Sequence, residues 1–153
     1  MEKQKIFIGS DHRGFELKLF LAEFLRSEGY EVSDMGPKAY DKDDDYPDYA
    51  EKVCEGVVGE QGLGVLICGS GQGMVRTANK FRGVYAALCW NEESARLAKE
   101  DGNPNVLCLS ASLTSGTDAK RIVEVWLNAE FLGHARHKRR IDKVKDIEKK
   151  QMK

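Results

Sequence analysis

Short apolar runs alternate with stretches of helical periodicity along the whole chain. Five runs have the length and apolar content of β-strands: residues 5–10, 31–35, 65–68, 84–89 and 106–109. After the first run, Leu17, Leu21 and Leu25 recur on one helical face, and Gly29 ends this helix. Four further stretches are predicted as helices: about 46–58, with Pro47 in its first turn, 92–99, 116–127 and 137–150.

The order of these elements predicts the fold class. Residues 65–68 (VLIC) are wholly apolar, as expected of a central parallel strand that is covered on both faces. Strands that alternate with helices form parallel sheets with helices packed on both sides. We therefore expect an α/β protein, a three-layer α/β/α sandwich with a five-stranded parallel Rossmann-like sheet. Residues 1–153 are interpreted as one domain that ends in a basic helix at about 137–150.

Charge and hydropathy exclude several classes of protein. The 153 residues include 24 Lys or Arg and 25 Asp or Glu, a formal net charge of −1. This balance argues against a protein that coats nucleic acid or an acidic membrane. No stretch reaches the roughly 18 to 20 apolar residues of a membrane span, and residues 1–5 lack a secretory apolar region. We expect a cytoplasmic protein with neither nucleic-acid nor membrane partners.

Two segments have biased charge. Residues 41–51 hold six acids and one lysine, a pattern that predicts a solvated loop leading into a helix N-terminus. Residues 133–153 hold nine bases and three acids. This basic tail is interpreted as a solvated helix face, with the alternative that its first turn clamps an anion.

Neither the cysteines nor the histidines predict a metal site. Cys54, Cys68, Cys89 and Cys108 are widely spaced, without the close pairs of zinc and redox motifs. His134 and His137 lie among Arg and Lys side chains that repel cations.

Two loops that follow strands carry the candidate chemistry, because ligands of open α/β sheets bind at the carboxyl ends of the strands. Residues 10–14 (SDHRG) follow the first strand, and residues 68–74 (CGSGQGM) follow the third. Gly69, Gly71 and Gly73 between a strand and a helix predict a nest of backbone N–H groups for an anion. The alternative is a tight turn. A dinucleotide site requires a different glycine spacing after the first strand.

Cys68 and the Asp11–His12 pair are the candidate reactive groups. Cys68 ends a strand beside a helix N-terminus, a position that favours the thiolate, whereas the other three cysteines lie inside predicted elements. The alternative is that Cys68 is also a small core residue. Asp11 and His12 are suited to hydroxyl binding and proton transfer, or alternatively to capping a helix.

Several stretches together resemble the type B ribose-5-phosphate isomerases and their galactose-6-phosphate and allose-6-phosphate isomerase relatives. The resemblance covers nearly the whole chain. The matching segments are IGSDHRGFELK (8–18), DYPDYAEKV (45–53), VLICGSGQGM (65–74), ANKFRGVYAAL (78–88), NVLCL (105–109) and the tail at 126–141.

The resemblance implies a cofactor-free aldose–ketose isomerase of phosphorylated sugars. Cys68 would move a proton between C1 and C2 through a cis-enediol, and Ser70 would shuttle the hydroxyl protons. The backbone amides of residues 69–73 would hold the enediolate oxygens. The other implied substrate ligands are Asp11, His12, Asn79, Arg136 and Arg140. The family forms dimers with shared active sites, so a homodimer or a dimer of dimers is expected.

Three positions depart from the family pattern. Asp101 and Gly102 occupy the place of a His–Asn pair whose His opens the sugar ring, and Ser112 replaces an Arg that reaches towards phosphate. Ribose 5-phosphate is the expected substrate. The alternatives are a hexose 6-phosphate, a different partner subunit that completes the site, and a sugar-phosphate-binding module without turnover.

Overall fold

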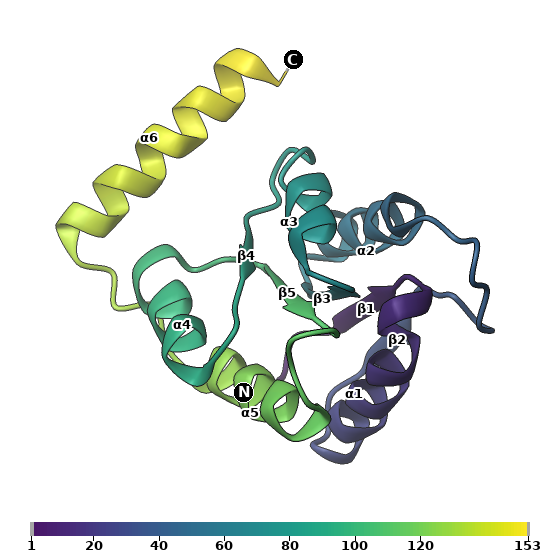
Figure 1. Ribbon diagram of the computed structural model, residues 1–153. Coiled ribbons are helices and arrows are strands. Elements are labelled where there is room, and N and C mark those ends of the chain that lie inside the picture. The colour runs from purple at the N-terminus through teal and green to yellow at the C-terminus, as the bar shows by residue number, and fades with distance from the viewer. Residues whose placement is uncertain (1, 153) are drawn as a thin grey trace.

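The computed structural model describes residues 2–152. Its centre is one sheet of five parallel strands in the order β2-β1-β3-β5-β4 (Figure 1). The strands are β1 (Ile6–Ser10), β2 (Val32–Asp34), β3 (Leu63–Cys68), β4 (Ala86–Leu88) and β5 (Val106–Ser110). The five predicted strands are confirmed, although β3 begins two residues earlier and β4 is shorter than expected.

Helices cover both faces of the sheet, which confirms the three-layer α/β/α architecture (Figure 1). One face is covered by α1 (Phe15–Ser27), α4 (Glu92–Leu97) and α5 (Gly116–Asn128). The other is covered by α2 (Tyr46–Glu60) and α3 (Gln72–Ala78). Two short turns flank these helices: the 3₁₀ turn η1 (His12–Gly14) and the π turn η2 (Ala98–Gly102). The helix predicted over 92–99 therefore continues as a π turn, which Asn103 ends in the left-handed region.

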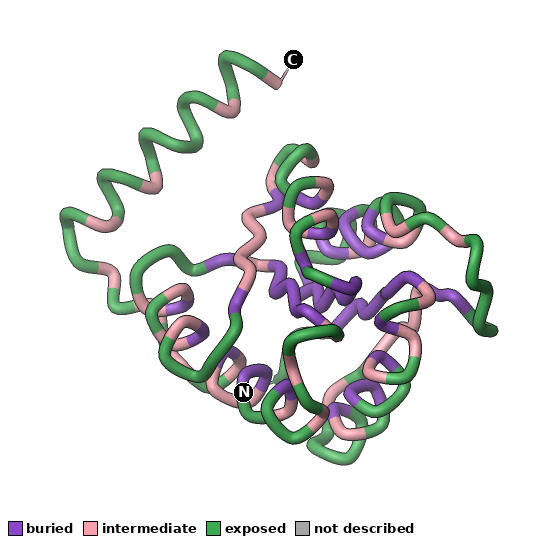
Figure 2. Tube along the Cα trace, viewed as in Figure 1, coloured by how far each residue is buried: buried purple, intermediate pink, exposed green. Residues whose placement is uncertain are grey.

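The core lies on both sides of the three central strands. β1, β3 and β5 are buried throughout, whereas the edge strands β2 and β4 are only partly buried (Figure 2). Leu21, Leu25 and Trp126 pack against one face, and Val53 and Met74 pack against the other. The uniformly apolar sequences of the central strands follow from this coverage on both faces.

The last helix, α6 (Ala135–Gln151), lies outside the three layers and contacts them at a few points, one of which is the N–H of Gly83, which donates to Oε1 of Glu148 at 3.0 Å (Figure 1). It contains no buried residue, in contrast to the other long helices (Figure 2). Val144 and Ile147 are more than half exposed, and Ile141 lies on the same side of the helix. Ile141 and Val144 face an open groove whose other wall includes Tyr85 and Phe131.

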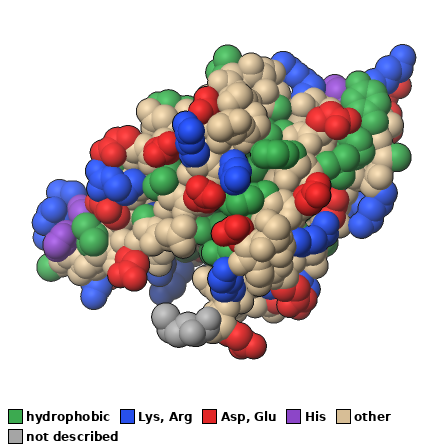
Figure 3. Space-filling view, turned by 90° about the horizontal axis from the view of Figure 1, so that it is seen from below, with side chains coloured by type: hydrophobic (Ala, Val, Ile, Leu, Met, Phe, Trp, Pro, Cys, Tyr) green, Lys and Arg blue, Asp and Glu red, His purple; other side chains and the backbone are tan. Residues whose placement is uncertain are grey.

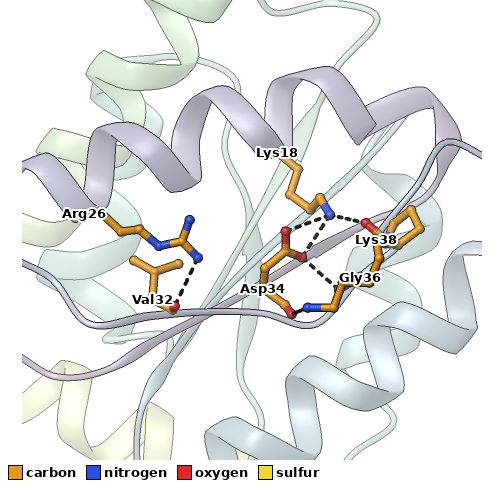
Figure 4. Close-up of polar contacts among 7 residues, drawn as sticks. Lys18, Arg26, Val32, Asp34, Gly36 and Lys38 are labelled. Carbon is orange, nitrogen blue, oxygen red and sulfur yellow. Dashed lines mark hydrogen bonds and ion pairs between the residues drawn. The ribbon is translucent and has the colours of Figure 1, made fainter.

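A buried lysine fixes the loop that follows β2. The Nζ of Lys18 on α1 lies 2.9 Å and 3.0 Å from the two carboxylate oxygens of Asp34, and it donates to the carbonyl of Pro37 (Figure 4). Asp34 also accepts from the backbone N–H of Gly36, whose carbonyl accepts from the N–H of Ser10. The ion pair thus supports the carboxyl end of β1. No local spacing in the sequence indicates this ion pair.

Charged side chains of both signs are interspersed on the face seen from below in Figure 3, in keeping with the net charge of −1. Histidines lie among the basic side chains at the left of that view. Within residues 2–152, no helix combines the length and the apolar composition needed to cross a bilayer.

Lys99 in η2 is expected to make stability depend on pH in the alkaline range. Its Nζ lies 3.9 Å above the Trp126 ring, and burial lowers the pKa of Lys99 to about 8. The unfolded chain binds this proton up to about pH 10.5, so the contribution of Lys99 to stability rises between pH 8 and pH 10.5. We expect Lys99→Met to stabilise the protein by about 1 to 3 kcal/mol at pH 7. Urea unfolding of both proteins across this pH range measures the difference.

Candidate active site

A pocket of about 310 Å³ opens at the carboxyl ends of β1 and β3. These two strands are neighbours in the sheet, and the chain leaves them towards opposite edges, which is where open α/β sheets bind ligands. The residues that line the pocket are Asp11, Arg13, Tyr46, Cys68, Gly69, Ser70, Gln72, Gly73 and Arg76.

Five of the residues predicted from the sequence meet in this pocket: Asp11, Cys68, Gly69, Ser70 and Gly73. The structure thus brings together the two loops singled out above. Cys68 is 4% exposed and ends β3, so the strand fixes its position while its side chain borders the pocket.

The glycine loop keeps backbone donors free. Among residues 2–152, the N–H groups of Gly69, Ser70 and Gly71 have no hydrogen-bond acceptor. Gly71 has φ of 79°, which places it in the left-handed region and turns the chain into α3. Its missing side chain also leaves room for Leu88. These free donors support the prediction of an anion nest.

Gly69 and Gly73 also leave space for side chains of the pocket wall. A Cβ on Gly69 would overlap the guanidinium of Arg13, and a Cβ on Gly73 would overlap the ring of Tyr46. Both positions need glycine because side chains of the pocket wall lie directly against the loop. The carbonyl of Gly69 is held by the hydroxyl of Ser110 at 2.7 Å and by the N–H of Ser112 at 2.9 Å.

Asp11 caps η1 and borders the pocket at the same time. Its Oδ1 accepts from the N–H groups of Arg13 at 3.0 Å and of Gly14 at 3.2 Å. The capping alternative is therefore observed. Asp11 can cap the turn and also line the pocket, because its second carboxylate oxygen has no hydrogen bond among the described residues.

His12 is paired with a carboxylate from the acidic loop. Asp44 is 5% exposed, and its Oδ1 lies 2.7 Å from His12 Nδ1 and accepts from the His12 backbone N–H at 2.9 Å. The prediction that the acidic segment is only a solvated loop is wrong at this residue. The hydrogen bond to Asp44 raises the pKa of His12, so its positive charge persists to a higher pH than that of an ordinary histidine.

The remaining cysteines are core residues, as predicted. Burial raises the pKa of Cys54 to about 12 and that of Cys89 to about 11, and it raises the pKa of Cys108 as well. Each thiol packs in one of the two cores. These groups stay protonated at neutral pH and contribute packing only.

Sequence reasoning missed four residues of the pocket: Arg13, Tyr46, Gln72 and Arg76. Arg13 directly follows Asp11–His12, and Gln72 lies within the glycine loop, so their places in the sequence were sufficient to nominate both. Tyr46 and Arg76 come from helices, and only their packing reveals them. The pocket thus has two guanidinium groups and one carboxylate on its walls.

Asn79 lies outside this pocket. Its side-chain amide donates to the carbonyl of Ala86 at 3.1 Å and accepts from the N–H of Ala86 at 2.9 Å. The residue predicted to contact substrate therefore bonds to the edge strand β4 in this chain. It borders a separate surface hollow that Asp101 and Gly102 also line.

Asp101, Arg136 and Arg140 also lie apart from Cys68 in this chain. Asp101 is 49% exposed, as its polar surroundings predict, and its Oδ1 is 3.7 Å from Nδ1 of His137, which is 11% exposed. Arg136 and Arg140 are exposed on the first turns of α6, one helical turn apart. Within residues 2–152, no three His, Cys, Asp or Glu side chains are grouped to hold a metal ion.

Known proteins resemble this chain in both sequence and fold. The family model described as Ribose/Galactose Isomerase matches residues 6–144. A probable ribose-5-phosphate isomerase B of Mycoplasma genitalium is 45% identical over 146 residues, which are 94% of this chain and 95% of the relative. A crystal structure of that isomerase with bound ribulose-5-phosphate has a TM-score of 0.91 at 45% identity, and the match covers 95% of this chain and 96% of that one.

A solved ribose-5-phosphate isomerase B of Clostridium thermocellum also has a TM-score of 0.91, at 44% identity, with 95% of this chain and 98% of that chain covered. Both the sequence and the fold therefore match over nearly the whole chain. The chain belongs to the ribose/galactose isomerase family.

Proposed function

We propose that the protein interconverts ribose 5-phosphate and ribulose 5-phosphate through a cis-enediol. The observation that carries this proposal is the placement of the Cys68 thiol in a pocket whose floor offers unbonded backbone N–H groups. A thiolate base beside preformed oxyanion donors suits proton transfer next to a carbonyl. Relatives at 45% and 34% identity are named probable ribose-5-phosphate isomerase B and ribose-5-phosphate isomerase B.

In the proposed mechanism, Cys68 removes the proton from C2 of the open-chain aldose. The electron pair forms the C1–C2 double bond, and negative charge develops on O1. The N–H groups of residues 69–71 and 73 stabilise this charge. Ser70 carries the proton between the O2 and O1 hydroxyls. Cys68 then returns its proton to C1, which yields the ketose, and no proton or electron is gained or lost.

Arg136 and Arg140 of a second copy of the chain complete this pocket in the proposed assembly. Arg136 and Arg140 stand on a helix without a buried residue, and Ile141 and Val144 of this helix line an open groove of about 400 Å³ together with Tyr85 and Phe131. Docking of this helix on a partner would bury its apolar stripe and bring the two arginines to the partner's phosphate. We therefore propose a homodimer or a dimer of dimers with shared sites, acting in the cytoplasm.

Proton exchange tests the proposed activity most directly. The protein is incubated in deuterated water with a panel of pentose and hexose phosphates, and exchange at C1 and C2 is followed by NMR. We expect exchange and conversion with the ribose 5-phosphate and ribulose 5-phosphate pair. Saturable binding without exchange of either proton would identify a sugar-phosphate-binding module. Faster conversion of a hexose 6-phosphate would reassign the substrate.

The residue at position 101 is expected to limit use of the closed sugar ring. Ring opening needs a proton for the ring oxygen, and the half-exposed Asp101 stands in the place of the histidine that would supply it in the family pattern. Conversion of ribose 5-phosphate should therefore plateau at the spontaneous ring-opening rate as enzyme is added. The reverse reaction should keep rising, because phosphorylated O5 prevents ribulose 5-phosphate from closing to a furanose. Coupled assays at increasing enzyme concentration measure both rates.

Rates proportional to enzyme in both directions would overturn this expectation and show that some residue opens the ring. The variants Asp101→Asn, His12→Asn and His137→Asn then distinguish the candidates. A lost forward rate with an intact reverse rate identifies the residue responsible.

A further inference from the structure

Neighbouring groups hold the Arg13 side chain in a fixed orientation on the pocket wall. Its guanidinium lies flat against Gly69, where any side chain would collide with it, and its Nη2 donates to the hydroxyl of Ser112 at 2.6 Å. Ser112 is itself held to the glycine loop, because its N–H donates to the Gly69 carbonyl at 2.9 Å. Arg13 comes from the end of β1 and Ser112 from the segment after β5, so the bond spans the mouth of β3.

The Arg13 charge has no counterion among residues 2–152. Among the described residues, no carboxylate lies within 4.0 Å of the guanidinium, and only one of its five N–H groups has a recorded partner. Asp11 is close in sequence, but its Oδ1 is occupied by the backbone N–H groups of residues 13 and 14. A hydroxyl partner fixes the orientation of the guanidinium and leaves its full positive charge available.

The neighbours of Arg13 favour a dianion over a sugar hydroxyl. His12 precedes it and is held by Asp44 in a state that favours positive charge. Arg76 adds a second guanidinium to the pocket. The planar fork of arginine matches two oxygens of a phosphate group, which distinguishes it from lysine at such a site.

We propose that Arg13 binds the phosphate group of the substrate and that Ser112 is the positioning residue that aims its guanidinium. This assignment rests on the proposed function in taking a sugar phosphate as the ligand. Arg13 belongs to the same chain as Cys68 and lies on the wall of the same pocket.

Binding and kinetics of three variants test the assignment. We expect Arg13→Ala to weaken binding of inorganic phosphate and of ribulose 5-phosphate by about 10- to 100-fold, as for a lost charge-assisted contact. The KM rises by the same factor, and kcat stays within about threefold, because the phosphate on C5 takes no part in the proton transfer between C1 and C2. Arg13→Lys should bind both ligands more weakly than the wild type and more tightly than Arg13→Ala, because lysine keeps the positive charge but lacks the planar set of donors. Arg121→Ala, at an exposed position on α5, is the matched control and should change neither value.

Ser112 is tested through its dependence on Arg13. Ser112→Ala should weaken phosphate binding about two- to tenfold, and Ser112→Thr, which keeps the hydroxyl, should restore it. In the Arg13→Ala background, Ser112→Ala should have no further effect, because its partner is already gone. Additive losses would show that Ser112 acts independently and would overturn the positioning role.

The outcomes separate this inference from the proposed function. An unchanged dissociation constant in Arg13→Ala, or a loss confined to kcat, overturns the phosphate assignment whatever the activity. A wild-type protein that binds ribulose 5-phosphate through Arg13 without converting it would contradict the proposed function and support the inference. Isothermal titration calorimetry provides the constants without requiring turnover.

Discussion

Replacing Cys68 by Ala is expected to lower turnover by about 10²- to 10⁴-fold, the usual contribution of a positioned acid or base. Binding of ribulose 5-phosphate should change little, because the pocket walls and the backbone N–H groups remain in place. Steady-state kinetics give the turnover, and calorimetry gives the dissociation constant. Circular dichroism melting confirms that the variant is folded.

The other cysteines supply the matched controls. Cys54 and Cys108 are buried in the core on the α2 side, so Ala at either position should affect stability and leave turnover per folded molecule unchanged. Iodoacetamide should modify Cys68 first, and a bound sugar phosphate should protect it. Turnover in Cys68→Ala equal to that of the wild type would remove this thiol from the mechanism.

Mixing two inactive variants is expected to restore activity. One variant carries Cys68→Ala, and the other carries Arg136→Ala with Arg140→Ala, both assayed at substrate concentrations well below KM. If each site combines Cys68 of one copy with the arginines of another, a hybrid dimer has one intact site. Random pairing after co-refolding then yields about one quarter of the wild-type sites, since half of the dimers are hybrids.

The controls for this experiment come from the same helix. Mixtures made with Lys149→Ala and Lys150→Ala in place of the arginine changes should behave like a mixture with the wild type, because exposed charges far along α6 contribute little. Each inactive variant refolded alone should stay inactive. Absence of recovery in the mixture, with hybrids demonstrated by mass spectrometry, would contradict shared sites.

The fold was predictable because its central strands are buried, which restricts their sequences to apolar residues. The segments at β1, β3 and β5 are buried along their whole length, so their apolar sequences identify them as strands covered on both faces. The edge strands are only partly buried, and their predicted bounds were less accurate. The π turn after α4 was not predicted, because a change from four-residue to five-residue hydrogen bonding leaves helical periodicity almost intact.

The site was predictable as far as it depends on strand ends. Asp11 and Cys68 meet because parallel strands place their carboxyl ends at one edge of the sheet. The contacts between side chains of distant segments were not predictable. The bond of Arg13 to Ser112 joins positions 99 residues apart, and the pairing of His12 with Asp44 depends on how one loop folds over another. No local spacing encodes either contact.

The side chain of Asn79 has a consequence for how copies of this protein can associate. Its amide bonds to both the N–H and the carbonyl of Ala86, which are the groups that face away from β5 on the outermost strand. One side chain thereby imitates the neighbouring strand that β4 lacks, and it blocks addition of a foreign strand at that point. Copies of the protein are therefore hindered from adding strand to strand at β4, which would lead to aggregates. Association through side chains, in contacts that close on themselves, is favoured instead.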